Sequence, residues 1–289
     1  MPVPKAWAHR FRLPGWMRKH TPLLYRIIEQ LADVKVLDCA TRLAAQAFLG
    51  AIPALFVVGT LAPDWLQQQL ISSIRTTLGL QNAALDQVRA LYSDGDVATA
   101  ASTGVVGVFV AVLSATACSR AMQRTCERCW HLPKAKATLA AWRWVAWVSV
   151  WLVALLFQGP IQDAFGTGPL GGFFLALATS ILLWWWTQHL LLAARVPWLP
   201  LLPGAVLAGV GQQLMNVVSK IYMPHAVAHS MKQFGSLGSV FVLLSWLIML
   251  FVVMTVAIAV GYVVAHEPFF ARRLHTPLPP PPPPQQQSR

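Results

Sequence analysis

Long apolar segments without charged residues alternate with short polar segments along the chain. Six runs contain no Asp, Glu, Lys or Arg, at residues 43–63, 97–119, 144–162, 164–194, 196–219 and 233–266. A helix of about 20 apolar residues crosses the roughly 30 Å hydrocarbon core of a bilayer. The pattern therefore predicts an all-α, polytopic membrane protein with about six transmembrane helices, near residues 41–62, 98–120, 142–160, 169–194, 201–222 and 236–265.

Two further segments have apolar residues at helical spacing but are too polar to cross a bilayer. In residues 20–37, apolar side chains recur every three or four positions, with Arg26, Glu29 and Asp33 between them. Residues 64–92 show a similar amphipathic pattern. Both segments are predicted to form amphipathic interfacial helices, the first on the cytoplasmic face and the second on the outer face.

These patterns divide the chain into three parts. Residues 1–38 form a basic cytoplasmic N-terminus with the first amphipathic helix, and residues 39–267 form the six-helix transmembrane domain. Residues 268–289 form a cytoplasmic tail with six consecutive prolines, at 279–284, followed by glutamines. This composition is typical of a disordered polyproline extension.

Composition supports a membrane protein and explains the strong positive charge. Hydrophobic residues make up 56% of the chain and charged residues 11%, against about 25% charged residues in soluble domains. The net charge is +12, and 18 of the 22 Lys and Arg lie in segments 1–42, 120–143, 195–200 and 266–289. Because Lys and Arg concentrate on the cytoplasmic side of membrane proteins, both termini are predicted to be cytoplasmic. The charge thus indicates contact with membrane lipids and no nucleic-acid partner.

The four cysteines lie in or beside predicted cytoplasmic segments, where thiols stay reduced. Cys126, Cys129 and His131 form the most metal-like pattern, because two thiols and an imidazole could supply three zinc ligands. A single Cys-x-x-Cys pair is a weak signal, and ordinary thiols at a helix end are the favoured interpretation. We therefore predict no metal and no cofactor.

Polar residues within apolar spans are costly in lipid and often functional. In the fifth predicted span, Gln212, Gln213 and Asn216 precede Lys220, and Gln46 lies in the first span. These residues are candidates for a substrate pathway, and the alternative is that they form hydrogen bonds between helices. At cytoplasmic helix ends, Arg42 and Arg120 are candidates for binding lipid headgroups, although snorkelling to the interface is their default role.

Several blocks of the sequence resemble one family of membrane proteins. Early blocks are Leu43-Ala-Ala-Gln-Ala-Phe-Leu before Ile52-Pro, and Ser119-Arg-Ala-Met leading to Trp130. The more specific blocks are Arg195-Val-Pro-Trp, Leu202-Pro-Gly-Ala, Phe234-Gly-Ser-Leu-Gly and Leu244-Ser-Trp-Leu. Over residues 20–267 the chain resembles the YihY/BrkB inner-membrane proteins, once labelled ribonuclease BN.

The resemblance implies a six-helix protein of the bacterial plasma membrane with no settled activity. Members are linked to serum resistance and proposed as exporters of lipid-linked precursors, and the nuclease label is regarded as a misassignment. Members typically end the sixth helix with Gly-Ala-Glu, whereas this chain has Gly261-Tyr262-Val263. A mechanism that needs this intramembrane carboxylate is therefore not expected here.

Two functions remain open at this stage, and neither is enzymatic. Nuclease chemistry requires clustered acids or histidines to hold metal ions, and all ten acids lie outside the apolar spans. The first function is transport or export of a lipid or amphiphile, and the alternative is a non-transporting envelope protein that organises lipids or partner proteins. Homo-oligomers or membrane-protein partners are conceivable. A wet cavity reaching Gln212 and Asn216 would favour transport, whereas pairing between these residues would favour the alternative.

Overall fold

The computed structural model describes residues 22–61, 67–69, 97–133, 141–163 and 168–267, together with positions 271 and 273. In this part of the chain every regular element is a helix, which agrees with the all-α prediction. The basic segment 1–21, nearly all of the second amphipathic segment and the proline-rich tail lie outside the described residues.

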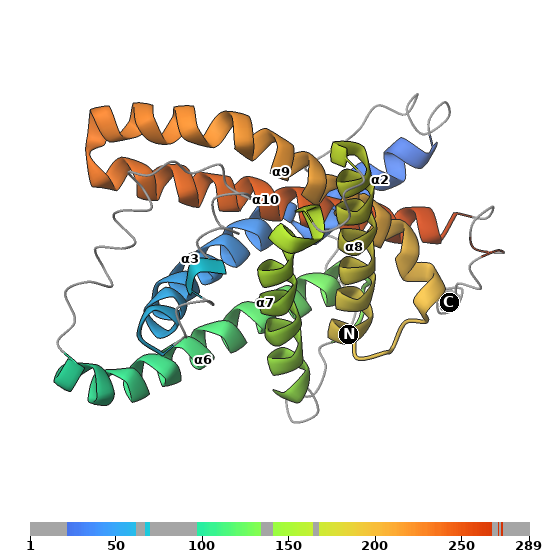
Figure 1. The fold of residues 1–289 in the computed structure, drawn as a ribbon. Coiled ribbons are helices and arrows are strands. Elements are labelled where there is room, and N and C mark those ends of the chain that lie inside the picture. The colour runs from blue at the N-terminus through green and yellow to red at the C-terminus, as the bar shows by residue number, and fades with distance from the viewer. Residues whose placement is uncertain are drawn as a thin grey trace, which may run out of the picture.

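Seven long helices follow one another along the described chain (Figure 1). They are α2 (Pro22–Val34), α3 (Val36–Leu61), α6 (Val97–Cys129), α7 (Ala141–Asp163), α8 (Gly168–Leu191), α9 (Trp198–Phe234) and α10 (Ser236–Ala265). Each predicted span falls on one of the last six. Two helices continue well past their predicted ends, α6 beyond 120 and α9 beyond 222, because hydropathy locates apolar segments and a helix can continue through polar ones.

Local sequence explains where two helices begin and end. Pro22 occupies the first position of α2, where its missing N–H costs nothing and its φ suits a helix. The α2 helix ends at Val34, and the next residue, Lys35, has a positive φ of 54° that separates α2 from α3. Gly235, with a φ of 62°, forms the turn between α9 and α10, and such a φ favours glycine.

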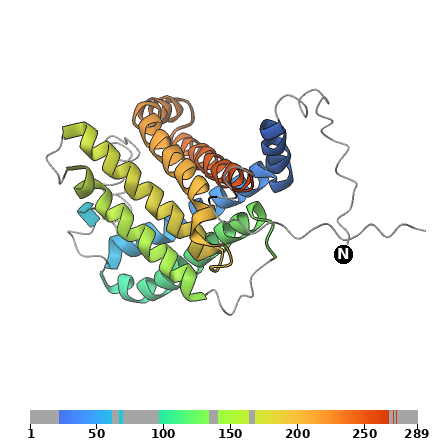
Figure 2. The ribbon, with the colours of Figure 1, turned by 90° about the vertical axis from the view of Figure 1, so that its right-hand side faces the viewer.

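The helices pack in the spatial order α7, α8, α9, α10, α3 and α6 (Figures 1 and 2). The α10 helix is central, because it also contacts α2 and α6. It comes close to the α9 backbone at Gly261, where a Cβ atom would overlap the backbone of Gly204. Small residues at a crossing allow this kind of backbone contact between membrane helices.

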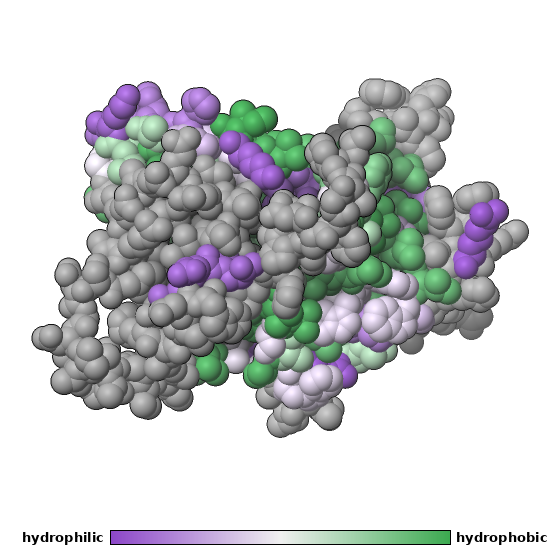
Figure 3. All heavy atoms as spheres, viewed as in Figure 1, coloured by the Kyte–Doolittle hydropathy of each residue, from purple (hydrophilic) through white to green (hydrophobic). Residues whose placement is uncertain are grey.

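Three helices in the described part of the chain are long and apolar enough to cross a membrane, over Gly171–Leu191, Trp198–Phe234 and Leu237–Ala265. With 37 residues at 1.5 Å per residue, α9 is about 55 Å long, well beyond the roughly 30 Å hydrocarbon core. On the face drawn in Figure 3, hydrophobic residues form patches among the described ones, and hydrophilic residues lie at the far end of the α9–α10 hairpin. These surfaces are typical of a membrane protein.

The segments predicted to share the cytoplasmic side meet at one end of the bundle, which we call the polar end (residues 22–42, 120–133, 192–198 and 266–267). Arg26 of α2 forms an ion pair with Glu267, 2.9 Å away, just after α10. Gln30 donates a hydrogen bond of 2.9 Å to the carbonyl of Cys129 at the end of α6. Val34 is fully buried, which contributes about 1.5–3 kcal/mol to holding α2 in place.

Candidate functional site

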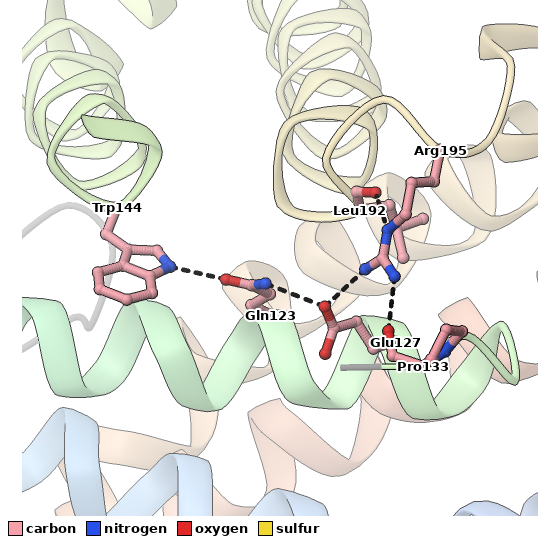
Figure 4. Close-up of polar contacts among 6 residues, drawn as sticks. All are labelled: Gln123, Glu127, Pro133, Trp144, Leu192 and Arg195. Carbon is pink, nitrogen blue, oxygen red and sulfur yellow. Dashed lines mark hydrogen bonds and ion pairs between the residues drawn. The ribbon is translucent and has the colours of Figure 1, made fainter. Parts of the chain in front are cut away.

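A buried carboxylate lies at the centre of the polar end. Glu127 of α6 is 3% exposed and accepts a 2.6 Å contact from the Arg195 guanidinium, which comes from the α8–α9 connection. Gln123 donates to the same carboxylate oxygen at 3.0 Å and accepts from the Trp144 indole N–H at 2.7 Å (Figure 4). The chain of contacts joins α6, α7 and the α8–α9 connection. We call these four residues the Glu127 network.

Arg195 is held in place by more than its carboxylate partner. Its Nε donates to the carbonyl of Leu192 at 3.0 Å and its second terminal nitrogen to the carbonyl of Pro133 at 2.5 Å (Figure 4). A planar guanidinium with several donors can satisfy a carboxylate and two carbonyls at once, which an ammonium on a flexible stem does less well. The geometry therefore requires arginine at this position.

Beside the Glu127 network, an open cleft lies between the start of α3 and the end of α6. Its volume is about 1110 Å³. Its walls carry more positive than negative charge, and hydroxyl groups add to its polarity. The charged and hydroxyl-bearing lining residues are Lys35, Asp38, Thr41, Arg42, Arg124, Thr125, Glu127 and Arg128. We call this cavity the basic cleft.

The charged side chains of the basic cleft differ in whether they have hydrogen-bond or ion-pair partners. Arg128 contacts the Val34 carbonyl at 3.5 Å and the Cys39 sulfur at 3.4 Å. Arg42 and Arg124 are exposed, and within the described part of the chain neither side chain forms a hydrogen bond or ion pair. Since Glu127 is paired with Arg195, its charge is largely cancelled. The cleft therefore has a net positive field that suits a phosphate or another anion.

The α2 helix and an aromatic cluster border the cleft. His131 lines the cleft, and its Nε2 lies 2.9 Å from the Oε1 of Gln30 on α2. Its ring packs edge-on against Tyr262 of α10, with ring centroids 5.2 Å apart, and Trp130 packs against the same tyrosine at 5.4 Å. These contacts hold the end of α6 against α2 and α10.

The two predicted headgroup residues have different surroundings. Arg42 lines the basic cleft. Arg120 is not one of the residues that line the basic cleft. Its guanidinium is 5.4 Å from the centre of the Trp144 ring, and its Nε donates to the Thr116 carbonyl at 3.2 Å. On α3, Gln46 is one turn beyond Arg42, and its Oε1 is buried without a hydrogen-bond partner among the described residues.

The predicted pathway residues of α9 are joined to one another and to α8. Gln213 is 8% exposed and donates to the Ser180 hydroxyl at 2.7 Å and to the Ala176 carbonyl at 3.0 Å. Weaker contacts of 3.4 and 3.5 Å connect Gln212 to Asn216 and Asn216 to Gln213. Lys220, further along α9, is exposed. The arrangement is the one expected for hydrogen bonding between membrane helices.

The residues of the metal-like motif, Cys126, Cys129 and His131, have different surroundings and do not face a common point. Cys126 and Cys129 are fully buried, whereas His131 is exposed and faces Gln30. Burial raises the pKa of the Cys126 thiol to about 12, with a further increase from the neighbouring Glu127 carboxylate, and burial also raises that of Cys129 well above its usual range. No group of three His, Cys, Asp or Glu side chains among the described residues is arranged to hold a metal ion.

The raised pKa values predict unreactive thiols at the end of α6. A thiol with a pKa of about 12 has roughly a thousandfold less thiolate at pH 8 than one near 9, and the thiolate is the nucleophile. We expect Cys126 to stay unlabelled by a maleimide in the folded protein and to react after denaturation, as measured by peptide mass spectrometry. Rapid, stoichiometric labelling of Cys126 in folded protein would contradict this packing.

Sequence reasoning did not identify the Glu127 network or the role of Arg124. One signal was available, because Glu127 is the single acid between Asp96 and Asp163 and lies in a strongly basic segment. An isolated acid among arginines indicates a specific partner. The sequence could not show that this partner is Arg195, since 68 positions separate the two residues.

Comparison with known proteins identifies the family. The sequence model of the family described as Virulence factor BrkB matches residues 27–279, which is most of the chain. No curated protein and no solved structure matches. The predicted resemblance is confirmed, and the apolar helices agree with it. The chain is a membrane protein that belongs to the BrkB virulence factor family.

Proposed function

We propose that this protein binds the phosphate-bearing headgroup of a membrane amphiphile in the basic cleft and exports that amphiphile across the bacterial plasma membrane. The observation that carries the proposal is the cleft of about 1110 Å³ with Arg42 and Arg124 exposed in its walls. Guanidinium groups form strong, charge-assisted hydrogen bonds with phosphate. In this function the protein binds and moves a ligand and catalyses no reaction.

The position of the cleft supports a lipid ligand. Leu37 is 67% exposed at the start of α3, next in sequence to the cleft residue Asp38. Apolar side chains beside basic ones are characteristic of the membrane interface, where acyl chains and phosphates meet. In the proposed topology the polar end faces the cytoplasm with both termini, because basic segments gather there.

Neutralising the two free arginines tests the proposal. An arginine near an anionic lipid surface contributes about 1 kcal/mol, so the double variant Arg42→Gln/Arg124→Gln is expected to bind phospholipid about thirtyfold more weakly. Binding is measured by native mass spectrometry of the detergent-solubilised protein titrated with phosphatidylethanolamine or phosphatidylglycerol.

A matched variant separates the cleft from general charge. Lys220→Gln/Lys232→Gln also removes two exposed positive charges, but these lie on α9 away from the cleft. This control is expected to bind both lipids nearly as well as the natural sequence. Equal losses in the two double variants would show that net charge and not the cleft determines binding, and the proposal would fail.

A second candidate function is lipid or partner organisation without transport. The hydrogen bonds that tie Gln212, Gln213 and Asn216 to one another and to α8 favour it, since these side chains then stabilise the bundle. Lipid profiling of each membrane leaflet in cells lacking the protein decides between the two. If the protein exports a lipid, that lipid accumulates in the inner leaflet of cells lacking the protein, and complementation restores its normal distribution. If loss of the protein has a phenotype but leaves the lipid composition of both leaflets unchanged, the organising role is supported.

A further inference from the structure

One acidic side chain in the basic cleft is not explained by phosphate binding. Asp38 lies one turn before Arg42 on α3, and both line the cleft. An acid and a base four positions apart on a helix commonly form an ion pair. Within the described residues, however, the Asp38 carboxylate has no hydrogen bond or ion pair, and the Arg42 guanidinium has none. The cleft thus presents one uncompensated carboxylate and two uncompensated guanidinium groups.

This charge pattern matches a ligand with charges of both signs. We propose that the basic cleft recognises a zwitterionic phospholipid headgroup, with its phosphate on Arg42 and Arg124 and its ammonium group on Asp38. This inference rests on the proposed headgroup site and specifies its ligand class. Four helical residues rise about 6 Å along the axis, a separation that a phosphate and an amine joined by a two-carbon linker can bridge with flexible side chains at each end.

The alternative for Asp38 is a purely structural role. It lies in the first turn of α3, where a carboxylate interacts favourably with the helix dipole. That role would be lost in an Asp38→Asn variant whichever lipid is present. A role in recognition changes the selectivity between lipids, which a structural role does not.

Lipid selectivity of Asp38→Asn tests the inference. The probes are phosphatidylethanolamine and phosphatidylglycerol with identical acyl chains, titrated into the detergent-solubilised full chain and followed by native mass spectrometry. The natural sequence is expected to bind phosphatidylethanolamine at least as tightly as phosphatidylglycerol, despite the latter's net negative charge. Asp38→Asn is expected to weaken phosphatidylethanolamine binding about fivefold, the range of an exposed ion pair, and to leave phosphatidylglycerol binding unchanged or tighter.

Controls separate the possible failures. Asp33→Asn, an exposed acid of α2 outside the cleft lining, is expected to leave both affinities unchanged. Tighter binding of phosphatidylglycerol to the natural sequence, or equal changes for both lipids in Asp38→Asn, would overturn the zwitterion assignment while the arginine site stands. If Arg42→Gln/Arg124→Gln also bound both lipids normally, the headgroup site itself would be wrong. Glycerophosphoethanolamine competing as well as the lipid would overturn the assignment to a lipid.

Discussion

An Arg195→Gln variant is expected to lose much of the stability of the fold. The substitution removes the Arg195 guanidinium, 2.6 Å away, from the Glu127 carboxylate, which is 3% exposed, and breaking a buried ion pair from one side costs about 3–5 kcal/mol. At roughly 2–4 °C per kcal/mol, the unfolding temperature is expected to fall by about 10 °C. The measurement is thermal unfolding of the detergent-solubilised protein, followed by size-exclusion chromatography of the surviving fraction.

A second substitution shows whether the buried charge is the cause. Glu127→Gln introduced together with Arg195→Gln also removes the buried carboxylate charge, and the double variant is expected to recover most of the lost stability. Arg124→Gln serves as the control on the same helix end, because Arg124 is exposed and its replacement leaves no buried charge. An Arg195→Gln variant as stable as the natural sequence would refute the role given to the pair, and so would a double variant no better than the single one.

Gly261→Ala is expected to disrupt the crossing of α9 and α10. The added Cβ would overlap the backbone of Gly204, which cannot move aside as a flexible side chain can. Forcing extra atoms into a packed interface costs about 1–3 kcal/mol and sometimes more, and a backbone clash belongs at the upper end. This cost exceeds the gain of about 1 kcal/mol that alanine offers over glycine within a helix.

Gly50→Ala provides the matched control for the crossing. Its Cβ would lie 3.4 Å from the Ser114 Cβ, which is close to ordinary contact, so this variant is expected to be as stable as the natural sequence or slightly more so. Thermal unfolding in the same detergent compares the two. If both alanine variants unfold at the same temperature, the close contact between α9 and α10 is not present in solution.

The sequence predicted the helices well and their ends less well. Charge-free runs located the last six long helices, and α10 has the predicted bounds of 236 and 265. The α9 helix was predicted to end near 222, yet it continues to Phe234 through Pro224 and Lys232. Hydropathy marks the residues that are suited to lipid, whereas a helix continues wherever backbone hydrogen bonds can form. The apolar segment and the helix therefore end at different residues.

The candidate site was predictable only in part. Arg42 was recognisable as a basic residue at a helix end, and it lines the basic cleft. The ion pair of Glu127 with Arg195, and the presence of Asp38 and Arg124 in the same cleft, depend on how α3, α6 and the α8–α9 connection pack together. Periodicity and charge counts describe one segment at a time, and they contain no information on such distant contacts.

Photo-crosslinking of a lipid in a bilayer tests the headgroup site most directly. The protein is reconstituted in vesicles of phosphatidylethanolamine and phosphatidylglycerol that contain a trace of phospholipid with a diazirine next to its glycerophosphate. We predict that crosslinked peptides are enriched in residues 35–43 and 121–132, which contribute the cleft lining, and that Arg42→Gln/Arg124→Gln removes this enrichment. Crosslinks spread evenly over the lipid-facing surfaces of α8, α9 and α10, and unchanged in the double variant, would contradict it.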